Sequence, residues 1–136
     1  AALSAPALAA VQDGARPFVT PELIDRVVRA ANAYGAAAPA VPVRDTIKVA
    51  RGGLVERTPD RSALAAVQTP QVFDYDLLQA ALSQADKEHA VVTDDCSAVE
   101  RLGMKVKLVE GEERNFKVTT RQDLLLARAL LQEEET

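Results

Sequence analysis

An apolar run, an amphipathic helix and a second apolar run follow one another at the start of this chain. The first run, 6–12, ends at an Asp-Gly pair, which predicts a buried strand that leads into a loop. A Thr-Pro pair at 20–21 is typical of a helix N-cap and first helical position. Apolar residues then recur at helical spacing as far as Gly35, a common helix stop, before the second run at 36–43. This strand–helix–strand unit predicts a parallel sheet with a right-handed crossover.

Two polar-alternating runs within 45–61 surround the pair Gly52-Gly53. Such a pair between alternating runs is typical of a hairpin turn. The apolar area along the two runs is too small to bury a two-stranded arm, and an isolated hairpin is only marginally stable in water. We therefore expect the hairpin to project from the domain and to dock on a second copy of the same chain.

Helical and strand patterns continue through the second half of the chain. Asp74 and Thr120 are typical helix N-caps, and Asp123 follows Thr120 at the spacing of a capping box. The acidic tail after the last helix is expected to fray. The predicted elements are helices at about 74–88 and 94–102, strands at 104–111 and 115–119, and a final helix from 120 to about 132.

The composition is that of one globular α/β domain with an aliphatic core. The chain has 136 residues, of which 48% are hydrophobic and only 4% aromatic. Its net charge of −4 argues against a nucleic-acid-binding protein, which would carry a basic surface.

The sequence also predicts a cytoplasmic protein. Its single cysteine cannot form an internal disulfide. The apolar start lacks the positive charges of a signal peptide, and no apolar run approaches the length of a membrane span. The chain does not begin with Met, from which we expect a fragment or a processed product.

Asp13 and Arg16 lie just beyond the first predicted strand, where an α/β protein can present polar groups to a ligand. A carboxylate there can hold Mg²⁺ or accept a hydroxyl, and an arginine three residues on can bind phosphate through two parallel hydrogen bonds. The same pattern occurs in ordinary turns, in which the arginine pairs with a nearby carboxylate. Taken alone, the pair favours the turn.

Four further polar residues also have an ordinary structural interpretation when each is taken singly. Arg61 follows the hairpin as a solvated surface arginine, and Thr69 lies in a Thr-Pro-Gln turn. Thr93 precedes two aspartates, which the helix dipole favours at a helix N-terminus. Lys117 has an apolar neighbour on either side, which is typical of a lysine that protects a strand edge from aggregation.

Nucleophilic, zinc and Walker-type phosphate-loop chemistry have no support in the sequence. Cys96 has no neighbouring histidine and is interpreted as a small core residue. His89, the single histidine, follows a predicted helix as a surface or capping residue. One His and one Cys cannot build a zinc site without several carboxylates. Neither a Walker-type loop nor a GxGxxG motif occurs.

Taken in order, these segments resemble the 2-C-methyl-D-erythritol 4-phosphate cytidylyltransferase family of the non-mevalonate isoprenoid pathway. The resemblance covers nearly the whole chain, from about Leu8 to Leu131. It rests on segments that fall in register: DGARPFVTPELIDRV (13–27), AVPVRDTIK (40–48), DRSALAAVQTPQVF (60–73), VTDD (92–95) and VKLVEGEERNFKVTTRQDL (106–124).

The resemblance implies a fold, an assembly and a reaction. The fold is a Rossmann-like α/β nucleotidyltransferase sheet with helices on both faces, of which residues 1–136 form a partial cytidylyltransferase domain. A β-arm, at about 44–62 here, would interlock two subunits of a homodimer. In the reaction, the phosphate of methylerythritol phosphate attacks the α-phosphorus of CTP, Mg²⁺ assists and pyrophosphate leaves.

The resemblance also implies roles for individual residues. Arg61, with Thr46 and Thr69, would grip the substrate phosphate in the site of the second subunit. Asp13 would contact the substrates and serve as the candidate metal ligand. The implied catalytic residues are Arg61 and Lys117, and the implied substrate-binding residues are Asp13, Arg16, Thr46, Thr69 and Thr93.

This sequence departs from the family pattern at several points. Gln12 stands where the family usually has His, Gly14 where it has Ala, and Ala65 where Trp is common. The glycine-rich loop that wraps the CTP triphosphate in the family does not occur in this sequence, and we expect this chain alone to be inactive. Two alternatives stay open: a ribitol-5-phosphate cytidylyltransferase, and a non-catalytic dimerisation module of the same fold.

Overall fold

The strand–helix–strand unit predicted from the sequence is formed by β1 (Leu8–Val11), α1 (Pro21–Tyr34) and β2 (Ala36–Pro42). The computed structural model describes residues 7–136, so the first residue of the predicted strand 6–12 lies outside the described residues. The α1 boundaries are as predicted, because Thr20 caps its start and Gly35, with φ of +86°, ends it in the left-handed conformation that glycine adopts most readily.

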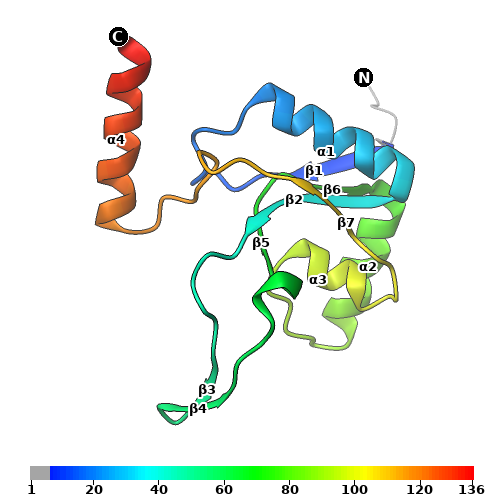
Figure 1. The fold of residues 1–136 in the computed structure, drawn as a ribbon. Helices are drawn as coiled ribbons and strands as arrows, with labels where there is room; N and C mark the ends of the chain where they lie inside the picture. The colour runs from blue at the N-terminus through cyan, green and yellow to red at the C-terminus, as the bar shows by residue number, and fades with distance from the viewer. Residues whose placement is uncertain (1–6) are drawn as a thin grey trace.

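The five-stranded sheet mixes parallel and antiparallel pairs (Figure 1). β6 (Gln71–Asp74) lies between β1 and β2 and runs antiparallel to both, so β1 and β2 are parallel without being neighbours. β5 (Ala65–Val67) pairs antiparallel with the end of β2, and β7 (Lys107–Glu110) runs parallel to β2.

Two expectations for the sheet were therefore partly wrong. The parallel strands are present, but the segment that contains Thr69-Pro70-Gln71 supplies β5 and β6 on either side of the turn predicted there. The first strand was expected to be buried, whereas β1 lies at an edge of the sheet and exposes Ala10 and Val11. A short apolar run predicts a strand, but it does not predict which neighbour the strand will pair with.

The core has one half on each face of the sheet, since successive strand residues point to opposite faces. On the face covered by α1, the buried residues are Leu23, Val27, Ala31, Ala37 and Val72. On the face covered by α2 (Tyr75–Lys87) and α3 (Asp95–Glu100) they are Ala36, Ala38, Phe73, Leu78, Ala81, Cys96, Ala98 and Val99. The predicted helices on both faces and the largely aliphatic core are confirmed.

Side-chain caps fix the later helices. Asp74 accepts a hydrogen bond from the N–H of Leu77 at the start of α2, and Asp94 forms a capping box at the start of α3. The predicted capping box of Thr120 and Asp123 begins α4 (Arg121–Glu135). Hydrogen bonds from backbone N–H groups of Thr119 and Thr120 lower the pKa of the Asp123 carboxyl.

Two predictions near the C-terminus were wrong. The tail expected to fray is helical as far as Glu135. The segment 115–119 was predicted as a strand but is an irregular loop. It pairs with another loop instead of a strand, since the N–H of Val118 donates to the carbonyl oxygen of Ala15 at 2.8 Å.

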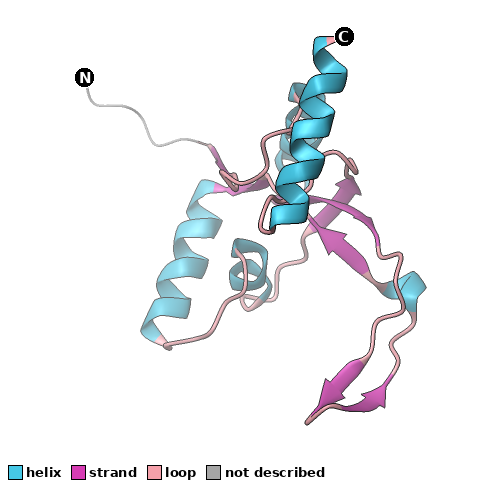
Figure 2. Cartoon of the chain, turned by 90° about the vertical axis from the view of Figure 1, so that its left-hand side faces the viewer, coloured by secondary structure: helices cyan, strands magenta, loops and turns pink. Residues whose placement is uncertain are grey.

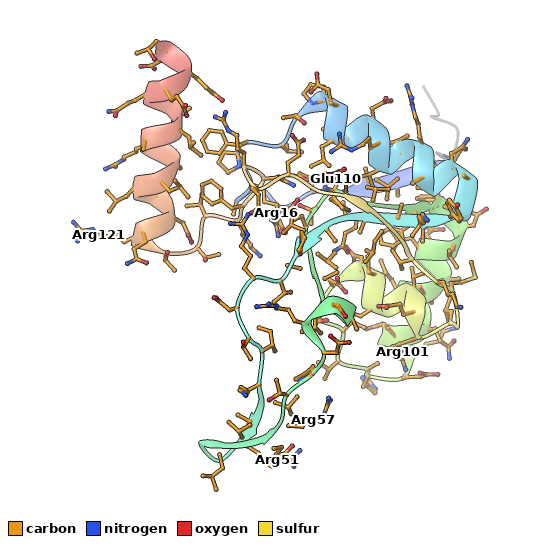
Figure 3. All side chains as sticks on the ribbon, in the orientation of Figure 1. Arg16, Arg51, Arg57, Arg101, Glu110 and Arg121 are labelled. Carbon is orange, nitrogen blue, oxygen red and sulfur yellow. The ribbon has the colours of Figure 1, made fainter. Side chains whose placement is uncertain are left out.

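The predicted hairpin is formed by β3 (Val49–Arg51) and β4 (Leu54–Arg57), which project from the rest of the fold (Figure 2). A short 3-10 helix, η1 (Arg61–Ala63), lies at its base. Figure 3 shows Arg51 and Arg57 extended from its outer part. Leu54 is 75% exposed and Val55 60% exposed, so the hairpin leaves apolar side chains in water.

No helix within residues 7–136 combines the length and the apolar character that crossing a membrane requires.

Candidate functional site

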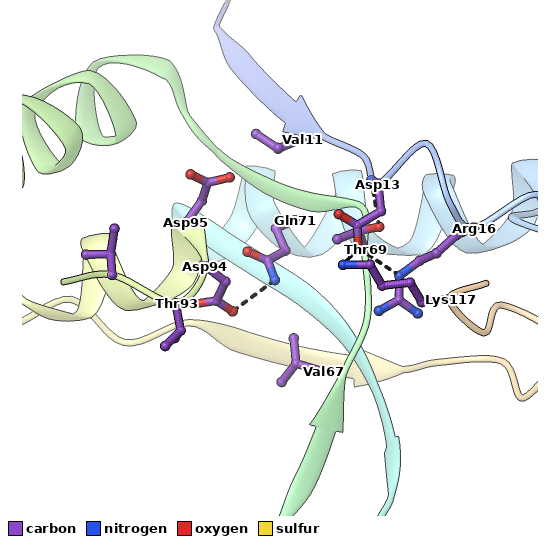
Figure 4. A pocket seen from close by; sticks show the side chains of 11 residues that line it. Val11, Asp13, Arg16, Val67, Thr69, Gln71, Thr93, Asp94, Asp95 and Lys117 are labelled. Atoms are coloured by element: carbon purple, nitrogen blue, oxygen red, sulfur yellow. Dashed lines mark hydrogen bonds and ion pairs between the residues drawn. The ribbon is translucent and has the colours of Figure 1, made fainter. Parts of the chain in front are cut away.

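A pocket of about 470 Å³ opens where β1 ends and β6 begins (Figure 4). It brings together side chains from four segments that are distant in the sequence. Five of the seven predicted site residues line it: Asp13, Arg16, Thr69, Thr93 and Lys117. The remaining lining residues are Val11, Val67, Gln71, Val92, Asp94 and Asp95.

At one end of the pocket, two cationic side chains form ion pairs with the same carboxylate. Arg16 Nε lies 3.2 Å from Asp13 Oδ2, and Lys117 Nζ lies 3.7 Å from the same oxygen. Lys117 is carried by the loop that follows β7, and that loop is hydrogen-bonded to the loop after β1. The ion pair expected from an ordinary Asp-Gly-x-Arg turn therefore forms, but it forms inside a pocket and includes a second cation.

The Arg16 side chain is held firmly at this end. It is only 11% exposed, and its Nη1 donates to the carbonyl oxygen of Asn115 at 2.7 Å. The Thr69 hydroxyl accepts a hydrogen bond from the N–H of Asp13 at 3.1 Å, which fixes the loop after β1 to the start of β6. A guanidinium that is already held in place can bind a phosphate with little loss of side-chain entropy.

The other end of the pocket is acidic and contains the start of α3. Asp94 accepts from the N–H of Ser97 at 2.8 Å and from Gln71 Nε2 at 3.1 Å. Gln71 is 5% exposed and also accepts from the N–H of Cys96, so its amide links β6 to α3. Burial, followed by the negative charges of Asp94 and Asp13, raises the pKa of the Asp95 carboxyl.

The two ends of the pocket differ in charge, with Arg16 and Lys117 at one end and Asp94 and Asp95 at the other (Figure 4). Arg16 and Lys117 suit a phosphate group, because both donate charge-assisted hydrogen bonds. Thr93, Asp94 and Asp95 suit hydroxyl groups, because carboxylate and hydroxyl oxygens accept hydrogen bonds. The arrangement is chemically matched to a small polyol phosphate.

The Asp13 carboxylate fits a Mg²⁺ ion that is bound by the protein and by substrate phosphates together. Mg²⁺ is usually held by one or two carboxylates and by substrate phosphates, and it keeps several waters. Within residues 7–136, His, Cys, Asp and Glu side chains form no cluster of three that could hold a metal alone. The donor set therefore fits a metal bound together with phosphate oxygens and does not fit a metal bound by protein ligands alone.

Thr46 and Arg61 do not reach the pocket of their own chain. Thr46 is exposed in the loop between β2 and β3. Arg61 lies in η1 and donates from Nη1 to the carbonyl oxygen of Arg44 at 2.7 Å. Thr69 was expected to act with them across a dimer, but it lies in the short connection between β5 and β6 and lines the pocket of its own chain.

The sequence-based site left out Gln71, Asp94 and Asp95. The two aspartates were interpreted only as a helix N-terminus, and Asp94 does cap α3 while lining the pocket. Gln71 was interpreted as part of a turn. One feature of the sequence could have indicated Gln71. It follows Thr-Pro directly and precedes the apolar pair Val72-Phe73, as the first residue of a strand would.

Cys96 is a core residue, as predicted. Its side chain is 6% exposed among apolar neighbours on the α2 and α3 face. Burial, with the charges of Asp94, Glu100 and Asp95, raises the pKa of its thiol to about 12. The thiolate needed for nucleophilic attack is therefore strongly disfavoured.

Replacing Asp95 by asparagine should raise the free energy of unfolding at neutral pH. Because the pKa of this carboxyl is raised in the folded protein, its charged form destabilises the fold. That penalty is full above the folded pKa and disappears as the pH falls below the unfolded pKa. We expect a gain below about 1 kcal/mol, because solvent screens the exposed part of the group.

Urea unfolding of both proteins from acid to neutral pH measures this difference. The matched control is Asp76→Asn in the first turn of α2, where a carboxylate is favourable and its loss should not stabilise. A gain for Asp95→Asn that is equal at every pH, or a loss at neutral pH, would contradict the assignment.

Comparison with known proteins agrees with this geometry. The family model described as 2-C-methyl-D-erythritol 4-phosphate cytidylyltransferase matches residues 2–133. The protein of that name from Geobacillus kaustophilus is 51% identical over 130 residues, which make up 96% of this chain and 57% of the relative. The one from Syntrophotalea carbinolica is 49% identical over 121 residues, or 89% of this chain and 52% of the relative.

Solved structures match as well. The crystal structure of 2-C-methyl-D-erythritol 4-phosphate cytidylyltransferase from Thermus thermophilus superposes with a TM-score of 0.85 at 44% identity, over 93% of this chain and 63% of that chain. These matches confirm the predicted fold class. The chain spans only about half the length of the curated relatives it matches.

Proposed function

Because the chain belongs to the 2-C-methyl-D-erythritol 4-phosphate cytidylyltransferase family, we propose that the protein transfers the cytidylyl group of CTP to 2-C-methyl-D-erythritol 4-phosphate. The products are 4-diphosphocytidyl-2-C-methyl-D-erythritol and pyrophosphate, and the reaction belongs to isoprenoid biosynthesis. The observation that carries this proposal is the pocket with cations at one end and carboxylates at the other, which matches a polyol phosphate.

The cationic end serves the attacking group. A phosphate oxygen of the alcohol forms a bond to the α-phosphorus of CTP, and the bond to the pyrophosphate oxygen breaks with its electron pair on the leaving group. Both reactants are anions, so catalysis depends mainly on placing positive charge and aligning the two groups. Arg16 and Lys117 bind the attacking phosphate and offset its repulsion from CTP.

Asp13 has two roles in this proposal. It holds the two cations by charge, since both lie within 4 Å of its Oδ2. It also serves as the protein ligand of Mg²⁺, which supplies charge stabilisation at the phosphates when bound. Thr69 and Asp13 position one another through the hydrogen bond between them.

The acidic end recognises the hydroxyl groups of the alcohol. The Asp95 carboxylate accepts hydrogen bonds from these hydroxyl groups and the Thr93 hydroxyl can accept or donate them, while Asp94 is held by α3 and Gln71. A phosphate bound at this end would meet carboxylates, which gives the substrate one favoured orientation.

We also propose a homodimer in which the arm of each subunit reaches the site of the other. The support is that the arm exposes apolar side chains, and that Thr46 and Arg61 lie at its base, outside the pocket of their own chain. A second copy would cover the apolar surface and would bring a further cation to each pocket. A cytoplasmic location and the absence of nucleic-acid partners stay predictions from composition.

The test is an assay of pyrophosphate release by the protein at its full encoded length, with CTP and either methylerythritol phosphate or ribitol phosphate. We expect turnover with methylerythritol phosphate and much weaker turnover with ribitol phosphate. Preference for ribitol phosphate would replace the proposed substrate. No turnover with either alcohol, in a folded protein that binds neither, would favour a non-catalytic dimerisation module.

A further inference from the structure

Two buried amide side chains, Gln68 and Asn115, lie beneath the cationic end of the pocket. Gln68 is 5% exposed and Asn115 is fully buried, and neither lines the pocket. Their side chains meet, since Asn115 Nδ2 donates to Gln68 Oε1 at 3.3 Å. We call this pair the Gln68–Asn115 brace.

Gln68 fastens the loop that follows β7. Its Nε2 donates to the carbonyl oxygen of Glu112 at 2.8 Å, and its Oε1 accepts from the N–H of Glu112 at 3.3 Å. The fit is tight, because a Cβ on Gly111 would lie 2.7 Å from Gln68 Oε1 and 3.0 Å from the carbonyl oxygen of Ala40. The brace therefore fixes the start of the loop that carries Lys117.

Asn115 connects this loop to the other two phosphate-binding elements. Its Nδ2 donates to the backbone carbonyl oxygen of Thr69 at 2.8 Å, and the backbone carbonyl oxygen of Asn115 accepts from Arg16 Nη1 at 2.7 Å. Lys117 follows two residues later. One buried residue thus contacts Thr69 and Arg16 and lies two residues before the lysine in the same loop.

The brace is not explained by stability alone. Asn115 Oδ1 is buried and has no hydrogen-bond partner among the described residues. A buried acceptor without a partner disfavours folding, and an apolar side chain at such a place often stabilises a protein as well as or better than a polar one. What an apolar residue could not do is donate to Gln68 and Thr69 at once.

We propose that the Gln68–Asn115 brace is a positioning device that holds Arg16, Thr69 and Lys117 in register for the phosphate of the alcohol substrate. This inference rests on the proposed function. The brace touches no substrate and acts only through the three residues that it holds. Because a misplacement of about 1 Å can cost about 100-fold in rate, a buried bond far from the reacting atoms can have a large effect.

Two near-isosteric variants test the brace in the protein at its full encoded length. Asn115→Asp keeps the volume and removes the Nδ2 donor, and Gln68→Met keeps the shape and removes every hydrogen bond of the amide. For each we expect kcat/KM for methylerythritol phosphate to fall about 10- to 100-fold. The KM for CTP should change much less, because the brace holds only the alcohol-phosphate end.

A control variant and two further readouts separate positioning from a general loss of stability. Val27→Ala, in the α1 core, is the destabilised control and should keep its kcat/KM below its melting temperature. Hydrogen exchange at the N–H of Val118 should quicken in both brace variants and not in the control. In Asn115→Asp the loss should diminish as the pH falls, since a protonated carboxyl can again donate to Thr69.

If the wild-type protein is active and both brace variants keep its kcat/KM, the inference is overturned while the proposed function stays intact. An equal loss in Val27→Ala would also overturn it, because the loss would then follow stability. If the wild-type protein does not transfer cytidylyl groups at all, the proposed function fails. Independently of activity, unchanged hydrogen exchange at the N–H of Val118 in both brace variants would overturn the positioning role of the brace.

Discussion

Replacing Lys117 by methionine should lower kcat/KM for cytidylyl transfer by about 100- to 1,000-fold in the protein at its full encoded length. The ammonium group lies 3.7 Å from Asp13 Oδ2 and lines the pocket beside Arg16. Removing it leaves one cation of its own chain to offset the repulsion between two anionic reactants. Steady-state kinetics with both substrates, together with a melting temperature, measure the effect.

The matched control is Lys107→Met. This lysine lies on β7 with its Nζ 5.0 Å from the ring centre of Tyr34, outside the pocket. It should keep nearly full activity. Wild-type kinetics in Lys117→Met, with or without a stability change, would remove Lys117 from the proposed site.

Mixing Arg61→Ala with Lys117→Met should restore activity that neither variant has alone. If the arm crosses to the second subunit, half of the randomly formed dimers contain one chain of each kind. One of the two sites in such a dimer combines the intact pocket of one chain with the intact arm of the other. An equal mixture should therefore recover about a quarter of wild-type activity.

A second mixture serves as the control. Asp13→Asn and Lys117→Met both change the pocket of a single chain, so every site in their mixed dimers is defective and no activity should return. Failure of the first mixture, with dimers demonstrated in solution, would show that Arg61 does not act across the interface. The two mixtures are compared after co-unfolding and refolding, or after co-expression.

Local features of the fold followed directly from the sequence. The Thr20-Pro21 start and Gly35 end of α1, the hairpin around Gly52-Gly53 and the capping box before α4 depend on neighbouring residues. Caps and tight turns are decided within a few residues, so short-range chemistry is enough to place them.

The failures lie where pairing partners decide the outcome. The loop at 115–119 alternates like a strand, yet its N–H groups bond to the loop after β1 and to its own preceding turn. Thr69-Pro70-Gln71 was interpreted only as a turn, and no strand was predicted on either side of it, but β2 offers a free edge on which β5 and β6 both pair. A strand depends on a neighbour that its own residues do not specify.

The site divides in the same way. The sequence alone supplied Asp13, Arg16 and Lys117 as candidates, and for each of them taken singly an ordinary structural role was favoured. Only the tertiary structure places both cations within 4 Å of one carboxylate oxygen and sets Asp94 and Asp95 at the opposite end. Charge, side-chain type and helix caps are properties of the chain and can be predicted from it. A pocket is made by segments that meet only when the sheet assembles. Long-range packing sets the distances between these segments, and electrostatic interactions and hydrogen bonds depend on those distances.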